Sequence, residues 1–432
     1  MFLALLRTRR FAPLFWCQFL SAFNDNFVRN MLAMLLLFRL GGSEAGMLIT
    51  LAIGIFILPS LFLSALGGEI ADARDKASVA RSLKFAEIFV QMIAAAGLWL
   101  ASLPLLYAGL FGLGVIATLF GPVKYGLLPD HLKRHELVAG NALVETATFL
   151  AILFGLVAGA LAAGRNVAPQ VITLQLMGIA LACFVTSCFI PPTGVAASHV
   201  RIRANILASS FVLLRELRGT PFLWRAGLAL SWFWLTGAVA ISLMPVAVRH
   251  ATSGGIEVEA AISGLFAVGI GTGSLAAARI AGGRIRLEPV PLAALGMAFF
   301  LVALGFATSG FAAHVNGKPA DQTLASFLTS PRGLFISFDI VGLAAAGGLF
   351  TVPLFAAVQA LSPSDRRART IAGVNILNAL YIVAGTLLTA VLQSRLFGFS
   401  EPLLLAGLGI CNLGAAAYVQ KAILPLPQST DV

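Results

Sequence analysis

The sequence contains few charged residues. Asp, Glu, Lys and Arg make up 11% of its 432 positions, whereas a soluble domain carries about 25%. Hydrophobic residues account for 59% of the chain, and its mean hydropathy is +0.93. Such a chain has too few polar side chains to cover a soluble surface, which excludes a soluble globular protein. We predict an all-α protein that crosses the membrane many times.

Cysteine is also scarce, with four residues in the chain. Cys17, Cys183, Cys188 and Cys411 each lie inside an apolar segment. They lack the paired spacing of metal-binding motifs and of the disulfide frameworks of secreted proteins. We therefore predict no metal site and interpret all four as small buried hydrophobic residues.

Motifs of enzymes and of nucleotide-binding proteins are missing as well. Gly271-Thr272-Gly273 lies in an apolar stretch without a preceding strand or a phosphate-binding lysine, which argues against an ATP-driven pump. His131 and Glu136 are spaced as in some acyltransferases, but the usual Asp is absent and a short basic loop separates them. We predict no catalytic residue and no cofactor. The net charge of +11 is spread over short clusters, which argues against nucleic-acid binding.

The chain consists mostly of long apolar segments. A membrane-spanning helix needs about 20 apolar residues. Twelve segments meet this requirement, with predicted limits at residues 11–39, 45–66, 80–102, 104–128, 136–163, 168–190, 222–249, 256–281, 287–309, 331–360, 369–395 and 398–421. The fifth contains Gly155-x-x-x-Gly159, a face of small residues that predicts close packing against another helix.

Lysine and arginine are unevenly divided between the two predicted membrane faces. If the N-terminus is cytoplasmic, most of the 29 basic residues fall on the cytoplasmic side, in clusters such as Arg7–Arg10, Arg74–Lys84 and Arg201–Arg225. Cytoplasmic loops of membrane proteins carry such an excess of positive charge. We therefore predict that both termini are cytoplasmic.

The longest cytoplasmic connection separates two groups of six spans. We predict an N-terminal six-helix bundle at residues 1–190, a linker at 191–221, and a C-terminal six-helix bundle with a short tail at 222–432. The segment Ile206–Leu217 is apolar at Ile206, Phe211, Leu213 and Leu214 and lies beside Arg215 and Arg218, which predicts an amphipathic helix at the membrane interface.

A short internal repeat supports this division. Gly121-Pro122-Val123, followed by Gly140-Asn141, recurs as Val352-Pro353-Leu354, followed by Gly373-Val374-Asn375. Two parallel halves of six spans with a ligand site between them are an arrangement of secondary transporters. The repeat therefore favours two pseudo-symmetric halves of six helices each.

One polar cluster interrupts the first apolar segment. It contains Asn24, Asp25, Asn26 and Arg29. Asp25 lies roughly 21 Å along the predicted helix, and Arg29, four residues later, shares its face and can pair with it. A carboxylate at mid-bilayer costs about 2.5–3.5 kcal/mol and usually faces a partner or a water-filled cavity. We predict a substrate-binding site, the alternative being that these groups only fix helix packing.

Further polar residues are predicted to lie inside the two bundles. Lys124, next to Tyr125 at the inner end of the fourth span, is placed to meet Glu145 of the fifth span. In the second half, the candidate binding residues are Asp339, Asn375 and Asn378. Each of them can also be explained by packing alone, because buried polar groups often satisfy one another.

The connection between the second and third spans carries a charged turn. Gly68, Asp72, Arg74 and Lys76 follow the pattern Gly-x-x-x-Asp-x-Arg-x-Lys, which resembles the cytoplasmic signature loop of the major facilitator superfamily. A glycine permits a tight turn, and an acid-base cluster can hold two halves together in one state and release them in another. We predict a conformational gate here rather than a solvated turn.

Three longer stretches carry a more specific resemblance. Gln18–Asn26, Gly121–Pro129 and Glu136–Glu145 together resemble the lysophospholipid transporter family of the major facilitator superfamily. They are similar also to the transporter part of bacterial proteins that fuse such a domain to an acyltransferase and an acyl-carrier-protein synthetase. The match is dense over about the first 165 residues and thinner but collinear afterwards.

The resemblance assigns roles to individual residues of the first half. Asp25 matches the acid of the family's first-span motif, and Glu145 matches its span-five motif. Lys124 and Tyr125 match the span-four motif. The buried polar pattern also selects Asp25, Lys124 and Glu145, and the resemblance adds Tyr125 to the candidate binding residues.

The second half departs from the family pattern. Transporters of the family carry an arginine in span seven and an acid in span eleven. Here residues 232–241 of span seven contain no charge, and span eleven offers Asn375 and Asn378 instead. Recognition of a lipid head group is therefore expected to depend more on Asp25 and Arg29.

The resemblance implies a lysophospholipid flippase of the bacterial cytoplasmic (inner) membrane. Such a protein moves lysophospholipids, typically lysophosphatidylethanolamine, from the outer to the inner leaflet by alternating access. A separate acyltransferase would then restore the missing acyl chain. We expect a monomer that is surrounded by membrane lipids.

Two other functions fit the same pattern. A proton-coupled exporter of hydrophobic drugs would use Asp25 and Glu145 as proton-binding acids. A non-transporting scaffold would recruit an acyltransferase through the Arg201–Arg225 segment. We take the flippase as the primary hypothesis because of the three motif stretches.

Overall fold

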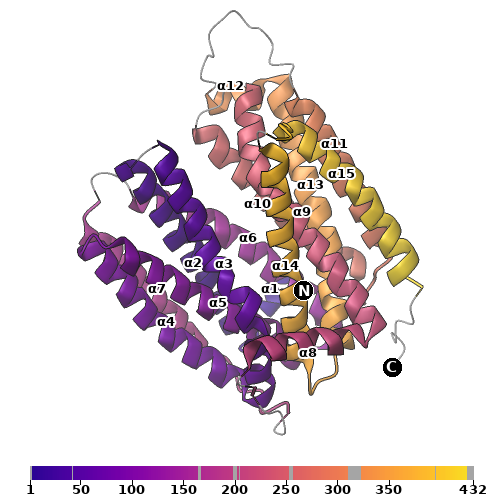
Figure 1. The fold of residues 1–432 in the computed structure, drawn as a ribbon. Helices are drawn as coiled ribbons and strands as arrows, with labels where there is room; N and C mark the ends of the chain where they lie inside the picture. Colours follow the sequence, from indigo (N-terminus) through magenta and orange to yellow (C-terminus); the bar gives the residue numbers. More distant parts are fainter. Residues whose placement is uncertain are drawn as a thin grey trace, which may run out of the picture. The chain divides into compact units, whose positions relative to one another are not determined.

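The computed structural model describes residues 2–40, 42–163, 167–197, 202–203, 205–252, 256–309, 323–394 and 396–425 (Figure 1). Arg201, at the edge of one predicted basic cluster, lies outside the described residues. Every described helix of 18 or more residues corresponds to one of the twelve predicted spans. These helices are α2 (Ala12–Leu40), α3 (Gly42–Ala73), α4 (Lys76–Trp99), α5 (Leu103–His131), α6 (Leu137–Ala162), α7 (Pro169–Cys188), α9 (Pro221–Thr252), α10 (Ile256–Ala281), α11 (Pro289–Thr308), α13 (Pro331–Leu361), α14 (Arg367–Gln393) and α15 (Glu401–Tyr418).

Eleven helices within the described ranges are long and apolar enough to cross a membrane. The helix missing from that set is α2, although it has 29 residues. Its polar cluster, which includes Asp25 and Arg29, lowers its hydropathy relative to the other spans. The prediction of an all-helical, polytopic fold is confirmed, and α2 is a span in which polar side chains replace part of the apolar surface.

Short elements connect or flank the long helices. They are α1 (Phe2–Leu5), η1 (Arg134–Glu136), α8 (Ile206–Arg218), α12 (Leu324–Thr329) and η2 (Val419–Ile423). The predicted interfacial helix corresponds to α8. Its first turn is capped by Asn205, whose side-chain oxygen accepts a hydrogen bond of 3.0 Å from the backbone N–H of Ala208.

The chain forms two compact units. The first unit comprises Met1–Trp224 together with Val358–Ala379, and the second comprises Arg225–Ala357 together with Leu380–Val432. The end of α13 and the beginning of α14 therefore belong to the first unit, although they follow the linker in sequence. The predicted boundaries at residues 190 and 222 describe chain order and stay a prediction.

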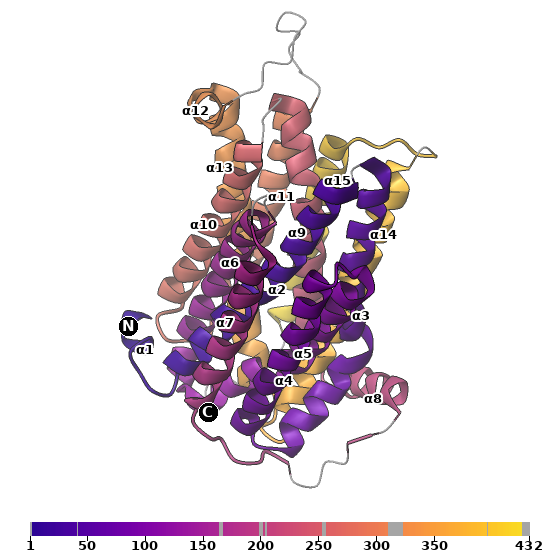
Figure 2. The same ribbon diagram turned by 90° about the vertical axis from the view of Figure 1, so that its left-hand side faces the viewer.

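Close helix contacts hold the first unit together. In it α2 packs against α6 and α7, α3 packs against α5, and α4 packs against α5 and α7 (Figures 1 and 2). The predicted small-residue face of α6 is confirmed. A Cβ atom at Gly155 would lie 2.6 Å from the carbonyl oxygen of Phe23, and one at Gly159 would lie 2.5 Å from that of Phe27. Only glycine permits this approach of the α2 and α6 backbones.

Aromatic and uncharged polar contacts connect the helices of the second unit. The rings of Phe233 on α9 and Phe350 on α13 stack at a centroid distance of 6.4 Å. Trp232 Nε1 on α9 donates a hydrogen bond of 3.1 Å to Asn412 Oδ1 on α15, and α15 packs along α11. Dispersion between large side chains therefore supplies much of the cohesion of this unit.

Candidate binding site and gate

A fully buried polar network joins α2 to α4. Asn24 Nδ2 donates a hydrogen bond of 2.6 Å to Glu87 Oε1, and Gln91 Nε2 donates one of 2.8 Å to Asn24 Oδ1. Lys84 Nζ lies 2.6 Å from Glu87 Oε2 and also donates to Ser21 Oγ at 2.6 Å. Because Asn24 is used in this network, it fixes the rotation of α2 about its own axis.

Lys84 and Glu87 are the main residues that sequence reasoning missed. The charge pattern predicts the basic cluster Arg74–Lys84 in a cytoplasmic loop, but Lys84 lies inside α4 and is 0% exposed. Its ammonium also lies 4.4 Å from the ring centroid of Phe120. A usable signal is present in the sequence: Lys84, Glu87 and Gln91 have the i, i+3, i+7 spacing of one helix face.

Asp25 and Arg29 lie on another side of α2, where both are half-buried. One residue further along a helix turns a side chain by about 100°, so Asp25 and Asn24 lie on different sides of α2, although Asp25 stays within electrostatic range of Glu87 and Lys84 on α4. Arg29 Nη2 donates to Asn26 Oδ1, and its guanidinium carbon lies 5.5 Å from the ring centroid of Phe56. The predicted electrostatic interaction of Asp25 with Arg29 is present, but the direct hydrogen bond goes to Asn26.

Lys124 and Glu145 extend this charged region to α5 and α6. Each lies within electrostatic range of the other, as predicted, and Lys124 also interacts with Asp25. Lys124 Nζ lies 4.7 Å from the ring centroid of Tyr125. Glu145 is 5% exposed, and its Oε1 has no hydrogen-bond partner among the described residues. An unpartnered buried carboxylate oxygen is costly, so this position is suited to receive a donor from a ligand.

We refer to Asp25, Arg29, Lys124 and Glu145 together as the first-unit charged site. It brings two acids and two bases from α2, α5 and α6 into one electrostatic neighbourhood. A ligand that carries both a cationic and an anionic group can pair with both signs at once. The site is chemically suited to bind such a ligand, because each charged group of the ligand meets a group of opposite sign.

The candidate residues of the second half fall into different units. Asn375 and Asn378 lie on the part of α14 that belongs to the first unit. The side chain of Asn375 packs beside Gly121 of α5, where a Cβ atom would be 3.1 Å from its Nδ2. Asp339 lies on α13 in the second unit and is 6% exposed. The structure therefore brings Asn375 to the helix that carries Lys124.

The second unit also contains an apolar cavity of about 250 Å³ between α9, α14 and α15. Its polar edges are supplied by Trp232, Tyr381 and Tyr418. The rest of its lining consists of Leu228, Ala229, Cys411, Gly414 and Ala415. An aliphatic chain matches such a surface because it displaces water without leaving polar groups unpaired.

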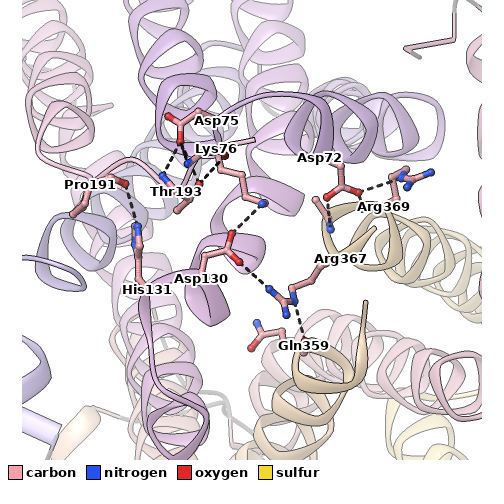
Figure 3. Close-up of polar contacts among 12 residues, drawn as sticks. Asp72, Asp75, Lys76, Asp130, His131, Pro191, Thr193, Gln359, Arg367 and Arg369 are labelled. Carbon is pink, nitrogen blue, oxygen red and sulfur yellow. Dashed lines mark hydrogen bonds and ion pairs between the residues drawn. The ribbon is translucent and has the colours of Figure 1, made fainter. Parts of the chain in front are cut away.

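The predicted gate residue Asp72 lies at the N-terminus of α14 (Figure 3). Its Oδ1 accepts a hydrogen bond of 3.0 Å from the backbone N–H of Ala368, and its Oδ2 accepts one of 3.1 Å from that of Arg369. Arg369 Nε lies 3.2 Å from Oδ2 as well. The first N–H groups of a helix have no partner within the helix, and they carry its positive end, so a carboxylate there is strongly favoured.

Lys76 extends this contact through Asp130 (Figure 3). Lys76 Nζ, which is 2% exposed, lies 2.9 Å from Asp130 Oδ2, and Arg367 Nη1 lies 2.8 Å from Asp130 Oδ1. Gln359 and Asn141 exchange two amide hydrogen bonds of 2.6 and 3.2 Å nearby. We call the contacts of Asp72 with Ala368 and Arg369, and of Asp130 with Lys76 and Arg367, the latch.

Gly68 and Arg74 differ in their relation to the latch. A Cβ atom at Gly68 would lie 2.7 Å from Cβ of Ala372 and 2.9 Å from Cα of Arg369, so glycine is needed where α3 meets α14. Arg74 is exposed, and its side chain has no hydrogen bond or ion pair with the residues that the structure describes. Three of the four predicted gate residues therefore meet the start of α14 directly or through Asp130.

Asp75 stabilises the turn between α3 and α4. Its Oδ2 caps α4 by accepting from the N–H of Ser78 at 2.8 Å, and its Oδ1 accepts from the N–H groups of Thr193 and Gly194 at 2.7 and 3.0 Å. Burial raises the pKa of this carboxyl, but these backbone N–H groups outweigh burial and hold the pKa below its ordinary value. Asp75 is therefore a charged anchor for the segment after α7.

Glu136 makes a structural ion pair near the start of α6. Its two carboxylate oxygens accept from Arg10 Nη1 and Nη2 at 2.7 and 2.6 Å. Arg10 Nη1 also donates to the carbonyl oxygen of His131 at 3.0 Å. This bidentate pair ties the segment before α2 to the start of α6.

A family model of the major facilitator superfamily matches residues 14–386 of the chain. Lysophospholipid transporters LplT are among the similar proteins. That of Enterobacter sp. (strain 638) is 29% identical over 371 residues, which cover 79% of this chain and 78% of the relative. That of Yersinia enterocolitica is 27% identical over 372 residues, which cover 82% and 80% of the two chains.

Solved structures with the same fold come from transporters of several kinds. The human organic anion transporter MFSD10 aligns with a TM-score of 0.70 and 16% identity, covering 94% of this chain and 99% of that chain. The fucose:proton symporter FucP of E. coli aligns with a TM-score of 0.70 and 12% identity, covering 95% and 97%. At these identities the likeness concerns the fold alone.

Proposed function

Because the chain belongs to the major facilitator superfamily of membrane transporters, we propose that it moves lysophospholipids across the membrane by alternating access. The first-unit charged site is the observation that supports this substrate class most strongly. A lysophospholipid carries a phosphate, often an ammonium group, and a single acyl chain. The site offers both signs of charge within a membrane-spanning bundle, which matches a head group that carries both signs.

We assign the head group to the first-unit charged site. Asp25 and Glu145 would attract the ammonium of lysophosphatidylethanolamine, and Arg29 and Lys124 would bind the phosphate. Glu145 Oε1 is available for this role because it has no hydrogen-bond partner among the described residues.

Alternating access requires a contact that forms and breaks, and we propose that the latch is this contact. It ties α3 and the end of α5 to the beginning of α14 through Asp72 and Asp130. In sequence, α14 belongs to the predicted C-terminal half. Opening of the latch would therefore separate parts of the two predicted halves, as rocking of a transporter requires.

The remaining parts of the proposal follow from the same function. The protein would lie in the bacterial inner membrane as a monomer with both termini in the cytoplasm, with its halves at residues 1–190 and 222–432. It would move lysophosphatidylethanolamine to the inner leaflet, and a separate acyltransferase would restore its second acyl chain. It would itself catalyse no covalent step.

Transport by purified protein in liposomes tests the substrate. We expect fluorescent lysophosphatidylethanolamine to cross between leaflets, and Asp25→Asn to slow this at least about tenfold because an ionic contact to the head group is lost. Glu257→Gln is the matched control, since Glu257 is exposed and the change also removes one negative charge. Unchanged transport by Asp25→Asn would contradict the role of Asp25.

The same liposomes separate a lipid transporter from a drug exporter. A hydrophobic cation should not compete with lysophosphatidylethanolamine for transport, because it lacks the phosphate that Arg29 and Lys124 would bind. Proton-driven uptake of such a cation, without lysolipid movement, would favour the exporter instead.

A further inference from the structure

The inner face of α8 is attached to α3 through the buried carboxylate of Glu69. Glu69 is 4% exposed. Its Oε1 accepts a hydrogen bond from Ser209 Oγ, and its Oε2 accepts one of 2.9 Å from the backbone N–H of Arg203. Because a buried carboxylate is costly to leave unpaired, this attachment fixes the beginning of α8 on α3.

The same face of α8 also contacts the beginning of α14. Leu213 packs in one apolar cluster with Ala372 and Ile376, and Glu216 lies 4.0 Å from Arg369 Nη1. Arg369 is the residue that the latch joins to Asp72. Thus α8 bridges the two helices that the latch holds together.

The outer face of α8 has a different composition. Leu207 and Phe211 are 56% and 76% exposed, and Arg215 and Arg218 are exposed on the following turns. Residues four apart share a helix face, so Leu207, Phe211 and Arg215 form one stripe. Figures 1 and 2 show α8 beside the end of α3, and in Figure 1 α8 runs crosswise to α3 and α5.

We propose that this outer face binds the anionic phospholipid headgroups of the bilayer surface, and that the bound lipids hold the latch closed. A helix that runs crosswise to membrane-spanning helices lies in the plane of the membrane surface. There Leu207 and Phe211 reach the boundary of the acyl chains, while Arg215 and Arg218 meet phosphates. The two exposed arginines favour anionic over zwitterionic headgroups.

Lipid binding affects the latch because α8 contacts both of its sides. When the start of α14 leaves α3, α8 has to give up either its contact with Glu69 or its contacts with Ala372 and Arg369. A lipid layer that binds α8 in its present position therefore has a higher affinity for the latched state, which shifts the equilibrium toward it. This inference rests on the latch being the moving gate, but not on the identity of the transported lipid.

Hydrogen exchange of the Ala368 and Arg369 amides measures latch opening, because Asp72 accepts from both. The protein is placed in nanodiscs of phosphatidylcholine with or without phosphatidylglycerol. We expect phosphatidylglycerol to slow exchange of these amides by about fivefold for each arginine that it contacts. In Arg215→Gln/Arg218→Gln, phosphatidylglycerol should no longer slow the exchange.

A matched control is Arg284→Gln/Arg286→Gln, which removes the same charge from two exposed arginines between α10 and α11. It should keep the lipid dependence of the wild type. Equal exchange of wild-type protein in both nanodiscs would overturn the proposal and leave a protein partner or a second copy as the occupant of the outer face. The proposal would also be overturned if phosphatidylglycerol still slowed amide exchange in Arg215→Gln/Arg218→Gln. If lysolipid transport fails while the lipid dependence of exchange remains, the proposed function is wrong and this inference stands.

Discussion

The two units differ in how they bury charge. Among the described residues, the second unit buries one charged side chain, Asp339. The buried charged residues of the first unit are Glu69, Asp72, Lys76, Lys84, Glu87, Glu136 and Glu145. Most of these make ion pairs or hydrogen bonds, since an isolated charge in a bundle is costly. Among the described residues, buried charge is therefore concentrated in the first unit.

Apart from Asp339, the buried polar side chains of the second unit are uncharged, and they are less completely paired. The side-chain atoms without a hydrogen-bond partner among its described residues belong to Trp234, Thr236, Ser274, Ser337 and Thr351. An unpaired hydroxyl costs much less than an unpaired charge. The second unit can therefore leave such groups unmatched without losing its fold.

The largest effect should come from breaking the Lys84–Glu87 pair. Lys84→Met leaves the carboxylate of Glu87 buried without its counter-ion, which should cost about 3–5 kcal/mol of unfolding free energy. Lys84→Met/Glu87→Gln removes both charges, and the amide oxygen introduced by Glu87→Gln would still accept from Asn24, so this variant should recover most of the loss. Denaturant unfolding in detergent measures both, with exposed Arg286→Gln as the control. Equal stability of the single and double variants would contradict a charge-pair role.

The next largest effect should come from removing a charge that would bind the lipid head group in the first unit. Arg29→Gln should slow lysolipid transport about tenfold or more, because a charged hydrogen bond contributes about 1.5–3 kcal/mol. The introduced amide can still donate toward Asn26, so the loss should be one of charge rather than of packing. Asp339→Asn should change transport less than about twofold, since one buried acid without an ionic partner among the described residues adds little recognition. A larger effect of Asp339→Asn than of Arg29→Gln would reverse the comparison.

The spans and the signature turn could be predicted from the sequence because each rests on local pattern. Twelve apolar segments and the Gly68–Lys76 pattern depend only on neighbouring residues. The small-residue face at Gly155 and Gly159 was predictable for the same reason, and α6 does approach the α2 backbone there.

Pairings between distant segments were harder to predict. Lys84 is charged and lies near the predicted end of a span, so its side chain is expected to be exposed to solvent like the loop arginines before it. Its partner Glu87, however, lies one turn further inside α4. The contact of Asp130 with Arg367 joins residues far apart in sequence. Hydropathy does not specify which of several basic residues reaches an acid, since that depends on helix rotation and on the approach of two backbones.

The latch should give an intermediate effect. Asp72→Asn keeps one carbonyl oxygen but loses the charge at the N-terminus of α14, which should weaken the contact by about 1 kcal/mol. Exchange of the Ala368 and Arg369 amides should then accelerate about fivefold. Arg74→Gln is the matched control, because Arg74 belongs to the same turn but makes no described contact with the latch. Acceleration by Arg74→Gln of the same size would mean that the whole turn, rather than Asp72, holds α14.

The smallest effect concerns the dependence of stability on pH. The pKa of Asp75 is held below its ordinary value in the folded protein, so its ionised form stabilises the fold. This contribution is fully present above the unfolded pKa of about 3.9 and is lost as pH falls through the folded pKa. Asp75→Asn still caps α4, and its unfolding midpoint should lie slightly below that of the wild type at neutral pH. The two midpoints should converge in acid. The contact of Asp75 with Thr193 would then stabilise the first unit only while Asp75 is ionised. A difference in unfolding midpoint between wild type and Asp75→Asn that grows toward low pH would instead show that the charge of Asp75 opposes folding.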